Sequence, residues 1–390
     1  MGLNIVVKNS AVVEFIQHLY GTKKPIHLHE PQFFGSEKDY LNRVIDSTFV
    51  SSVGEYISQF EDMISGYSGS ENAVAVVNGT AGLHAALYAS GVGPGDMVIT
   101  QALTFVATCN AINMVGAKPI FVDVSQIGLG LCPVALEQYL EEYTYLSDKG
   151  DCLLKKGNKV IRAVLPVHTF GHPVHLDELI AICKKWNLLL IEDAAESLGS
   201  VYKKKHTGTF GLFGVVSFNG NKIITTGGGG IVLCRNKSDA IRLKHLTTTA
   251  KSPHPYKFFH DELGFNYRMP NLNAALGCAQ LEHLEIYLDR KRTLATGYNN
   301  FFANSEFEFV KEPIYAKSNY WLNAIICANK KERDSLLDDT NRSGVMTRPI
   351  WTPMHKLPMY SDCERGDLSM TDWLEDRVVN LPSTPSIQGD

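Results

Sequence analysis

The sequence predicts an α/β fold in which a mostly parallel sheet is covered by helices on both faces, followed by a smaller α+β domain. Short apolar runs alternate with segments of helical periodicity from residue 73 to about residue 240, and the pattern changes near residue 305. Nearly continuous apolar runs are typical of parallel strands that are buried on both faces. Strands that alternate with helices indicate that such a sheet is layered between helices.

The predicted strands follow one another through the first part of the chain. They span residues 73–79, 96–100, 118–124, 160–168, 188–194, 215–218 and 230–234. Helical patterns separate several of them, at residues 80–91, 104–117 and 176–187. Glycine-rich turns separate the last pairs of strands.

A different pattern follows this series. Residues 270–302 are predicted to be helical, because leucines and alanines recur at three- and four-residue spacing. Strand-like residues 307–313 and 320–328 then precede a helix that begins near Lys331. This order of elements predicts a second, smaller α+β unit.

We expect the chain to divide into three parts at these changes. Residues 1–30 form an N-terminal extension, residues 31–265 a large cofactor-binding α/β domain, and residues 266–390 a connecting helix with the smaller α+β C-terminal domain. Within the extension, VVEFIQHLYGT has the apolar spacing of a short amphipathic helix that packs on the fold.

The composition is that of an ordinary soluble globular protein, with 44% hydrophobic residues, 20% charged residues and a formal net charge of −4. No basic stripe predicts a nucleic-acid partner, and no apolar stretch of about 18 residues predicts a membrane span. The eight cysteines are scattered without a C-x-x-C pair, which argues against a disulfide framework or a structural zinc. Since a secretory signal is also missing, we expect a cytoplasmic protein.

Polar groups follow the ends of several predicted strands. Asp193 ends one strand, Asn219 and Lys222 follow another, and Phe105 and the Gly79–Ala81 turn lie at helix starts. Because ligands gather at the carboxyl ends of parallel strands, we expect these loops to meet at one edge of the sheet.

Lys222 lies between two apolar segments, where partial desolvation would favour the neutral amine. A neutral lysine amine is the nucleophile that condenses with an aldehyde cofactor. Asp193 suits the same chemistry, since a carboxylate can keep the ring nitrogen of pyridoxal phosphate protonated; a helix N-cap is its ordinary alternative role. The two residues together predict a pyridoxal phosphate site.

A phosphate group needs donors. Gly79, Thr80 and Ala81 offer backbone N–H groups and a hydroxyl at a helix start, where the helix dipole favours an anion, although the same residues also suit an ordinary turn. Ser217 adds a second hydroxyl. Phe105 can either stack on a planar ring or belong to the core.

The glycine tract Gly227–Gly230 does not fit a nucleotide-phosphate loop. Lys222 precedes the glycines and a strand follows them, whereas a P-loop requires the lysine after the glycines and then a helix. The tract therefore predicts a turn with close backbone approach and positive φ, and it argues against an NTP-hydrolysing domain.

Three histidines, His168, His172 and His175, lie within VHTFGHPVH. Their spacing is not that of a helical metal motif, and Pro173 argues against a regular helix, so we expect no metal. His168 lies at the end of a predicted strand and is a candidate for the substrate side of the site.

The order of several stretches resembles the DegT/StrS-type nucleotide-sugar aminotransferases, of the aspartate-aminotransferase fold (fold type I). The resemblance runs from about Pro31 to Pro385. The matching stretches include VNGTAGLHAAL, TFVATCNAI, IEDAAESLGS, SFNGNKIITTGGGGIV and GFNYRMPNLNAALGCAQL.

The resemblance implies pyridoxal phosphate as cofactor, with Lys222 as the lysine that bonds to it. The implied cofactor-binding residues are Gly79, Thr80, Ala81, Phe105, Asp193, Glu196, Ser217, Asn219 and Asn266. The implied role of Asn266 is to reach the cofactor phosphate of a second subunit, so a homodimer with shared active sites is expected. Glu196 stands where many members have glutamine, which leaves open how a carboxylate meets the phenolic oxygen of the cofactor.

The resemblance is strongest to the branch that makes 4-amino-4,6-dideoxy sugars for polysaccharides and lipopolysaccharides, especially in the legionaminic-acid pathway. It implies a UDP-linked 4-keto-6-deoxy-N-acetylhexosamine as substrate and L-glutamate as amino donor. The alternatives are a GDP-perosamine-type 4-aminotransferase, a 3-aminotransferase, and a non-catalytic regulatory protein that binds the cofactor. Lys222 favours transamination over deoxygenation, because related 3-dehydrases carry histidine there. His168, Arg348, His355 and Tyr360 are the expected substrate-binding residues.

Overall fold

The computed structural model describes residues 7–386, in which the central sheet has nine strands. Seven of them follow the order β1-β11-β10-β7-β6-β2-β3, and β4 and β5 extend the sheet beside β6. These strands are β1 (Asn72–Val76), β2 (Met97–Gln101), β3 (Lys118–Val122), β4 (Thr144–Leu146), β5 (Cys152–Leu154), β6 (Val160–Leu165), β7 (Leu189–Asp193), β10 (Phe213–Ser217) and β11 (Gly230–Cys234).

The predicted, mostly parallel sheet is confirmed for the middle of this order. Strands β3, β2, β6, β7 and β10 pair in parallel, whereas β11 is antiparallel to both β10 and β1. The reversal arises because a turn, and not a crossover helix, joins β10 to β11. Strands β1, β7 and β10 therefore still run in the same direction, and their carboxyl ends share one edge.

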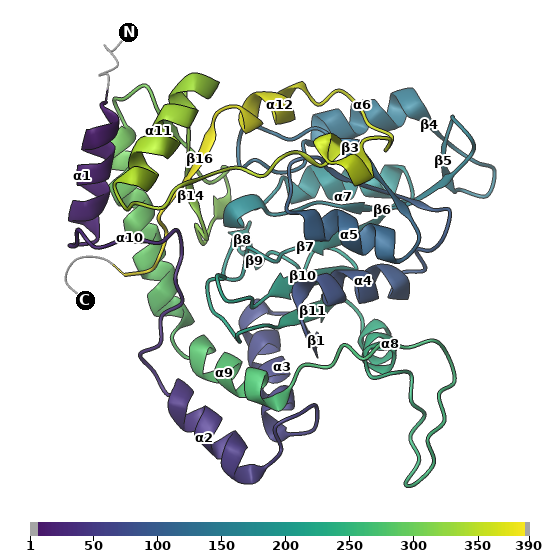
Figure 1. The fold of residues 1–390 in the computed structure, drawn as a ribbon. Helices are drawn as coiled ribbons and strands as arrows, with labels where there is room; N and C mark the ends of the chain where they lie inside the picture. Colours follow the sequence, from purple (N-terminus) through teal and green to yellow (C-terminus); the bar gives the residue numbers. More distant parts are fainter. Residues whose placement is uncertain (1–6, 387–390) are drawn as a thin grey trace.

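Helices cover both faces of this sheet (Figure 1). Neighbouring residues of a strand point to opposite faces, so Val98 packs with α4, α5 and α8 while Met97 and Ile99 pack with α6 and α7. Helices α2, α3 and α9 cover the β1–β11–β10 end of that second face. The helices are α2 (Glu37–Ser47), α3 (Glu55–Ser68), α4 (Gly79–Ala89), α5 (Val106–Met114), α6 (Pro133–Tyr143), α7 (Leu176–Lys185), α8 (Lys237–Thr247) and α9 (Asn271–Leu281).

A four-stranded antiparallel sheet, of order β12-β14-β16-β15, lies in the C-terminal part. Its strands are β12 (Glu308–Phe309), β14 (Asn323–Ile326), β15 (Arg348–Pro349) and β16 (Val378–Leu381). Helix α10 (Leu284–Phe302) leads into it, so the helical stretch predicted over 270–302 is two helices, α9 and α10, with a break at Glu282 and His283. Helix α1 (Asn9–Leu19) packs against α10 and α11 (Lys330–Arg342) (Figure 1).

Smaller elements complete the described part of the chain. They are β8 (Val201–Tyr202), β9 (Lys205–His206) and β13 (Ala316–Lys317), which form a third small sheet, helix α12 (Ser369–Glu375), and the 3-10 turns Thr169–Gly171, Met354–Lys356 and Pro358–Tyr360. The division into three domains stays a prediction, and the outermost residues of its first and last parts, 1–6 and 387–390, lie outside the described residues. Among the helices that the structure describes, none is long and apolar enough to cross a membrane.

A buried lysine joins α10 to the C-terminal sheet. Lys291 is 0% exposed, and its Nζ donates hydrogen bonds to the backbone oxygens of Trp321 (2.8 Å) and Ser383 (2.6 Å). Burial lowers the pKa of Lys291 well below its ordinary value. The carbonyl oxygens compensate for the water that this group loses, and they attach the loop before β14 to α10.

The segment between α8 and α9 forms an arm that extends away from the sheet (Figure 1). Antiparallel β-bridges pair Thr248 with Asn266 and Lys251 with His260, and they hold the outgoing and returning segments of the arm together. Its apolar side chains, Tyr256, Phe258, Phe259 and Leu263, are exposed.

Candidate active site

A cavity of about 350 Å³ opens at the edge where β1, β7 and β10 end. Its walls come from the turns that follow these strands and from two tryptophans of the C-terminal part, Trp321 and Trp351. Eight of the predicted site residues line it: Gly79, Thr80, Phe105, Asp193, Glu196, Ser217, Asn219 and Lys222. The loops expected to meet at one sheet edge therefore do meet there.

Asp193 is the last residue of β7 and is 4% exposed. Its Oδ2 accepts a hydrogen bond from Thr108 Oγ1 (2.8 Å), and its Oδ1 accepts one from the Ala195 amide (3.1 Å). Burial raises the pKa of Asp193, and the hydrogen bond from Thr108 opposes that rise. The carboxylate is thus held in one orientation and would gain from a cationic partner in the cavity.

Glu192, the neighbour of Asp193, points to the other face of the sheet and supports this edge from behind. It accepts hydrogen bonds from the amides of Gly208 (2.8 Å), Phe210 (2.7 Å) and Gly211 (2.7 Å). Burial alone would raise the pKa of Glu192, but His168 and the amides of Gly211 and Gly208 lower it below its ordinary value. The carboxylate therefore ties the loop before β10 to β7.

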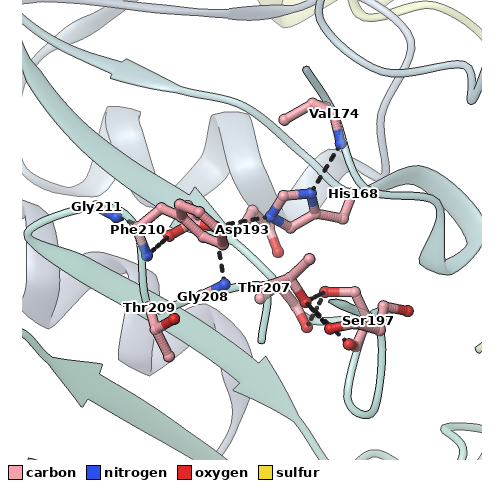
Figure 2. A network of polar contacts seen from close by, with 12 residues as sticks. His168, Val174, Asp193, Ser197, Thr207, Gly208, Thr209, Phe210 and Gly211 are labelled. Atoms are coloured by element: carbon pink, nitrogen blue, oxygen red, sulfur yellow. Dashed lines mark hydrogen bonds and ion pairs between the residues drawn. The ribbon is translucent and has the colours of Figure 1, made fainter. Parts of the chain in front are cut away.

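His168 belongs to this supporting network and not to the cavity wall (Figure 2). Its Nδ1 accepts a hydrogen bond from the Val174 amide (3.2 Å), so Nε2 carries the proton and donates it to Glu192 Oε2 (3.0 Å). The side chain is 0% exposed. Because both ring nitrogens are used inside the protein, the structure leaves His168 no free group for a substrate.

Lys222 ends a tight turn after β10, in which its amide donates to the Asn219 carbonyl (2.9 Å). Its Nζ lies 3.8 Å from the ring centroid of Trp321 and 3.5 Å from Glu196 Oε1, and its side chain is 13% exposed. The structure places an aromatic face and a carboxylate beside this amine.

Glu196 is nearly buried between the cavity and the Phe170 backbone. Its Oε2 accepts a hydrogen bond from the Phe170 amide (2.8 Å), and its other oxygen faces Lys222. Burial raises the pKa of Glu196 to about 7, although the charge of Lys222 opposes the rise. Near neutral pH, this carboxyl group is therefore available in both its protonated and its ionised form.

The start of α4 faces the cavity with Gly79 and Thr80. Ala81 does not line it, because its amide donates to the Asn78 side chain (2.8 Å) in the helix cap and its side chain is buried. A Cβ on Gly79 would lie 3.1 Å from Ser217 Cβ, so the start of α4 and the end of β10 are in close approach. The first amides of a helix and two neighbouring hydroxyls form a donor set that suits an anion.

The glycine tract explains this close approach. Gly227 has a φ of 77°, and a Cβ on Gly230 would lie only 2.8 Å from the carbonyl carbon of Asn78. The prediction that the tract serves a turn with close backbone approach is confirmed, since a side chain at Gly230 would push β11 away from the start of α4.

Three further predicted residues lie away from the cavity wall. Arg348 is exposed and donates to the Thr347 carbonyl (2.8 Å), and Tyr360 donates to Asn110 Oδ1 (2.6 Å). His355 Nε2 lies 3.2 Å from a carboxylate oxygen of Asp372.

Asn266 is exposed at the base of the arm, where its side-chain oxygen accepts hydrogen bonds from Arg268 (3.0 and 2.9 Å). Within one copy of the chain, the structure does not bring Asn266 to the cavity.

Sequence reasoning missed several cavity residues, namely Asn78, Thr108, Asn221, Trp321 and Trp351. Thr108 follows Phe105 in the first turn of a predicted helix, so the sequence could have placed its hydroxyl near the same sheet edge as Phe105. The two tryptophans lie in the C-terminal part, and no spacing in the sequence connects them to a strand end of the large sheet.

The residues of the cavity fit pyridoxal phosphate. Helix-start amides and two hydroxyls suit its phosphate, the buried Asp193 carboxylate suits a protonated ring nitrogen, and the Lys222 amine suits its aldehyde. Phe105 is 53% exposed at the edge of the cavity, where its ring can cover a planar ligand.

Comparison with known proteins supports the same chemistry. Residues 33–390 match the DegT/DnrJ/EryC1/StrS aminotransferase family. The chain is 38% identical to a GDP-perosamine synthase of Escherichia coli O157:H7 over 94% of this chain and 95% of that protein. It is 34% identical to the putative pyridoxal phosphate-dependent aminotransferase EpsN of Bacillus subtilis, over 94% and 93%.

Solved structures agree with these relatives. A DegT DnrJ EryC1 StrS aminotransferase from Brucella abortus superposes with a TM-score of 0.81 at 26% identity, over 90% of each chain. The predicted fold type is thus confirmed along with the family. Because the match covers nearly the whole chain and the cavity holds the groups that the cofactor requires, this protein belongs to the DegT/DnrJ/EryC1/StrS aminotransferase family and is a pyridoxal phosphate-dependent sugar aminotransferase.

Proposed function

We propose that this enzyme transfers an amino group from L-glutamate to carbon 4 of a nucleotide-linked 4-keto-6-deoxy sugar. The observation that carries the proposal is the placement of Lys222 and Asp193 in one cavity at the carboxyl edge of the sheet. The resemblance of the sequence to the legionaminic-acid branch favours a UDP-linked N-acetylhexosamine. Relatives named GDP-perosamine synthase, at 38%, 32% and 35% identity, favour a GDP-linked sugar as the second candidate.

Each group of the cavity has a defined task in this reaction. Bound pyridoxal phosphate supplies an electron sink for the substrate carbon that loses a proton. The Lys222 amine would hold the cofactor through its aldehyde; when the amine is free, its Nζ takes the proton from the donor α-carbon and returns a proton to the sugar carbon. Asp193 would keep the ring nitrogen protonated, and Thr80 and Ser217 would bind the phosphate together with the amides of α4.

Glu196 replaces the glutamine that many family members carry. We propose that its protonated form donates a hydrogen bond to the phenolic oxygen of the cofactor, as the amide of glutamine would. Its raised pKa, about 7, supports this role because the protonated acid is present near neutral pH. A carboxylate in the same position would repel a phenolate.

We further propose that two copies of the chain share their active sites. Asn266 is exposed at the base of an arm whose aromatic side chains, Tyr256 and Phe258, are 78% and 82% exposed. Large apolar side chains exposed in one region mark a surface that another molecule covers. A second copy would cover the arm and would receive Asn266 at its own cavity.

Replacing Lys222 with alanine tests the catalytic assignment. The Lys222→Ala enzyme should lose turnover by roughly 10³-fold or more, because both the covalent attachment and the proton carrier are removed. Borohydride reduction followed by mass spectrometry should find no cofactor fixed to the variant, whereas the wild-type protein should carry it on Lys222. Full activity in this variant would refute the assignment.

The substrate is tested by mass analysis of products from UDP-linked and GDP-linked 4-keto-6-deoxy sugars, each with glutamate. With the UDP-linked N-acetylhexosamine, we expect the product mass to show that the ketone has been replaced by an amine. NMR should place this amine at carbon 4. Conversion of the GDP-linked sugar alone would select the second candidate, and amination at carbon 3 would exclude both.

Shared active sites predict complementation between two inactive variants. Lys222→Ala and Asn266→Ala subunits, mixed and allowed to exchange, should form mixed dimers in which one of two sites is intact. About one quarter of wild-type activity should then return. Sedimentation should show a dimer, and a monomeric active enzyme would contradict the proposal.

Glu196 predicts a pH-dependent stability of the cofactor-free protein. Since its pKa is about 7 when folded and near 4.5 when unfolded, the folded protein binds more protons between these values, and wild-type stability falls as pH rises through this window. Glu196→Gln removes this loss, so its stability relative to wild type should increase by roughly 2–3 kcal/mol from about pH 4.5 to pH 8.

Denaturant unfolding at both pH values measures this difference. Glu71→Gln, at an exposed position, is the matched control for the substitution itself. An equal change in stability at the two pH values for Glu196→Gln would show that the Glu196 carboxyl group does not titrate as described.

A further inference from the structure

Trp321 contacts the reacting amine although it comes from a distant part of the chain. Its ring centroid lies 3.8 Å from Lys222 Nζ, within the range of a cation–π interaction. The side chain lines the cavity and is 5% exposed. Little water therefore competes for the face of the ring that the amine contacts.

Three hydrogen bonds, one from the indole ring and two from the backbone, fix the position of Trp321. The indole Nε1 donates to the Asn221 carbonyl (2.7 Å), so the ring is attached to the residue that precedes Lys222. The Trp321 amide donates to Asn319 Oδ1 (2.8 Å), and the Trp321 carbonyl accepts from Lys291 Nζ (2.8 Å). The ring thus has a fixed place relative to the lysine.

The same frame also holds Glu196, whose Oε1 lies 3.5 Å from the amine. Asn319, which is 1% exposed, donates its side-chain amide to the carbonyls of Glu196 (2.9 Å) and Leu198 (2.8 Å). One buried asparagine therefore connects the backbone of Trp321 with the backbone of Glu196. The carboxyl group and the aromatic face are positioned as a pair around Lys222 Nζ.

We propose that Trp321 is a positioning residue, which together with Glu196 forms a cradle that holds the Lys222 ammonium, the form of the amine after it has accepted the donor proton and in the cofactor-free protein. The inference rests on the proposed role of Lys222 in the transfer reaction. A lysine side chain that is released during turnover regains its rotamer freedom and would otherwise leave the reacting atoms. The cradle retains the protonated amine beside the cavity until it returns its proton to the sugar carbon.

The test uses cofactor-free protein and the reaction of Lys222 with acetic anhydride, which acylates only a neutral amine. Protein grown with mono-, di- and trifluorotryptophan keeps the shape of the ring while fluorine withdraws electron density from its face. We expect the acylation rate of Lys222, followed by mass spectrometry of its peptide, to rise stepwise along this series. The total increase at about pH 8 should be three- to tenfold.

Two variants control this measurement. Trp321→Phe protein grown on the same fluorinated tryptophans should show no stepwise trend, although Trp351 in the same cavity is still fluorinated. Glu196→Gln, which conserves the shape of the side chain, should raise the acylation rate several-fold by removing the anion. Correct folding is checked by circular dichroism.

An acylation rate that is independent of fluorination in the wild-type background would overturn the proposal, as would an equal trend in Trp321→Phe protein. Neither result depends on the sugar substrate or on turnover. The cradle could therefore be confirmed while the proposed substrate fails, or refuted while the substrate is correct.

Discussion

The shape of the cavity depends on the buried carboxylate of Glu192, the residue that precedes Asp193 in β7. Glu192 accepts three backbone amides from the loop before β10 and a hydrogen bond from His168, so the ends of β6, β7 and β10 have fixed positions relative to one another. Adjacent strand residues point to opposite faces, and the rigid anchoring of Glu192 therefore orients Asp193 toward the cavity. Catalytic groups that must act together need neighbouring residues that hold their side chains in fixed positions.

The second half of the site is supplied by the C-terminal part. Lys291 and Asn319 are both buried, and they attach the Trp321 loop to α10 and to the Glu196 backbone. The large sheet thus positions the groups that would meet the cofactor, whereas the smaller part supplies the aromatic wall beside Lys222. A cavity lined by both the large sheet and the C-terminal part places the reacting amine where little water reaches it.

The backbone next to Glu196 adopts an unusual conformation at Phe170. Phe170 adopts a φ of 55°, in the left-handed region that a bulky side chain rarely enters, and its amide donates to Glu196. The strained backbone is compensated by the buried hydrogen bond and by packing of the Phe170 ring near Trp321 and Trp351. The strain therefore lies beside the carboxyl group with a pKa raised to about 7.

Local pattern alone determined the parallel sheet, the edge at which Asp193 and Lys222 meet, and the role of the glycine tract. These properties follow from apolar runs, strand ends and turn chemistry, which act over a few residues. Only the tertiary structure decided that Trp321 contacts Lys222, that His168 supports β7 from behind, and that Arg348, His355 and Tyr360 lie away from the cavity wall. Contacts between segments 100 residues apart depend on how the C-terminal part packs against the large sheet, and sequence spacing does not encode that geometry.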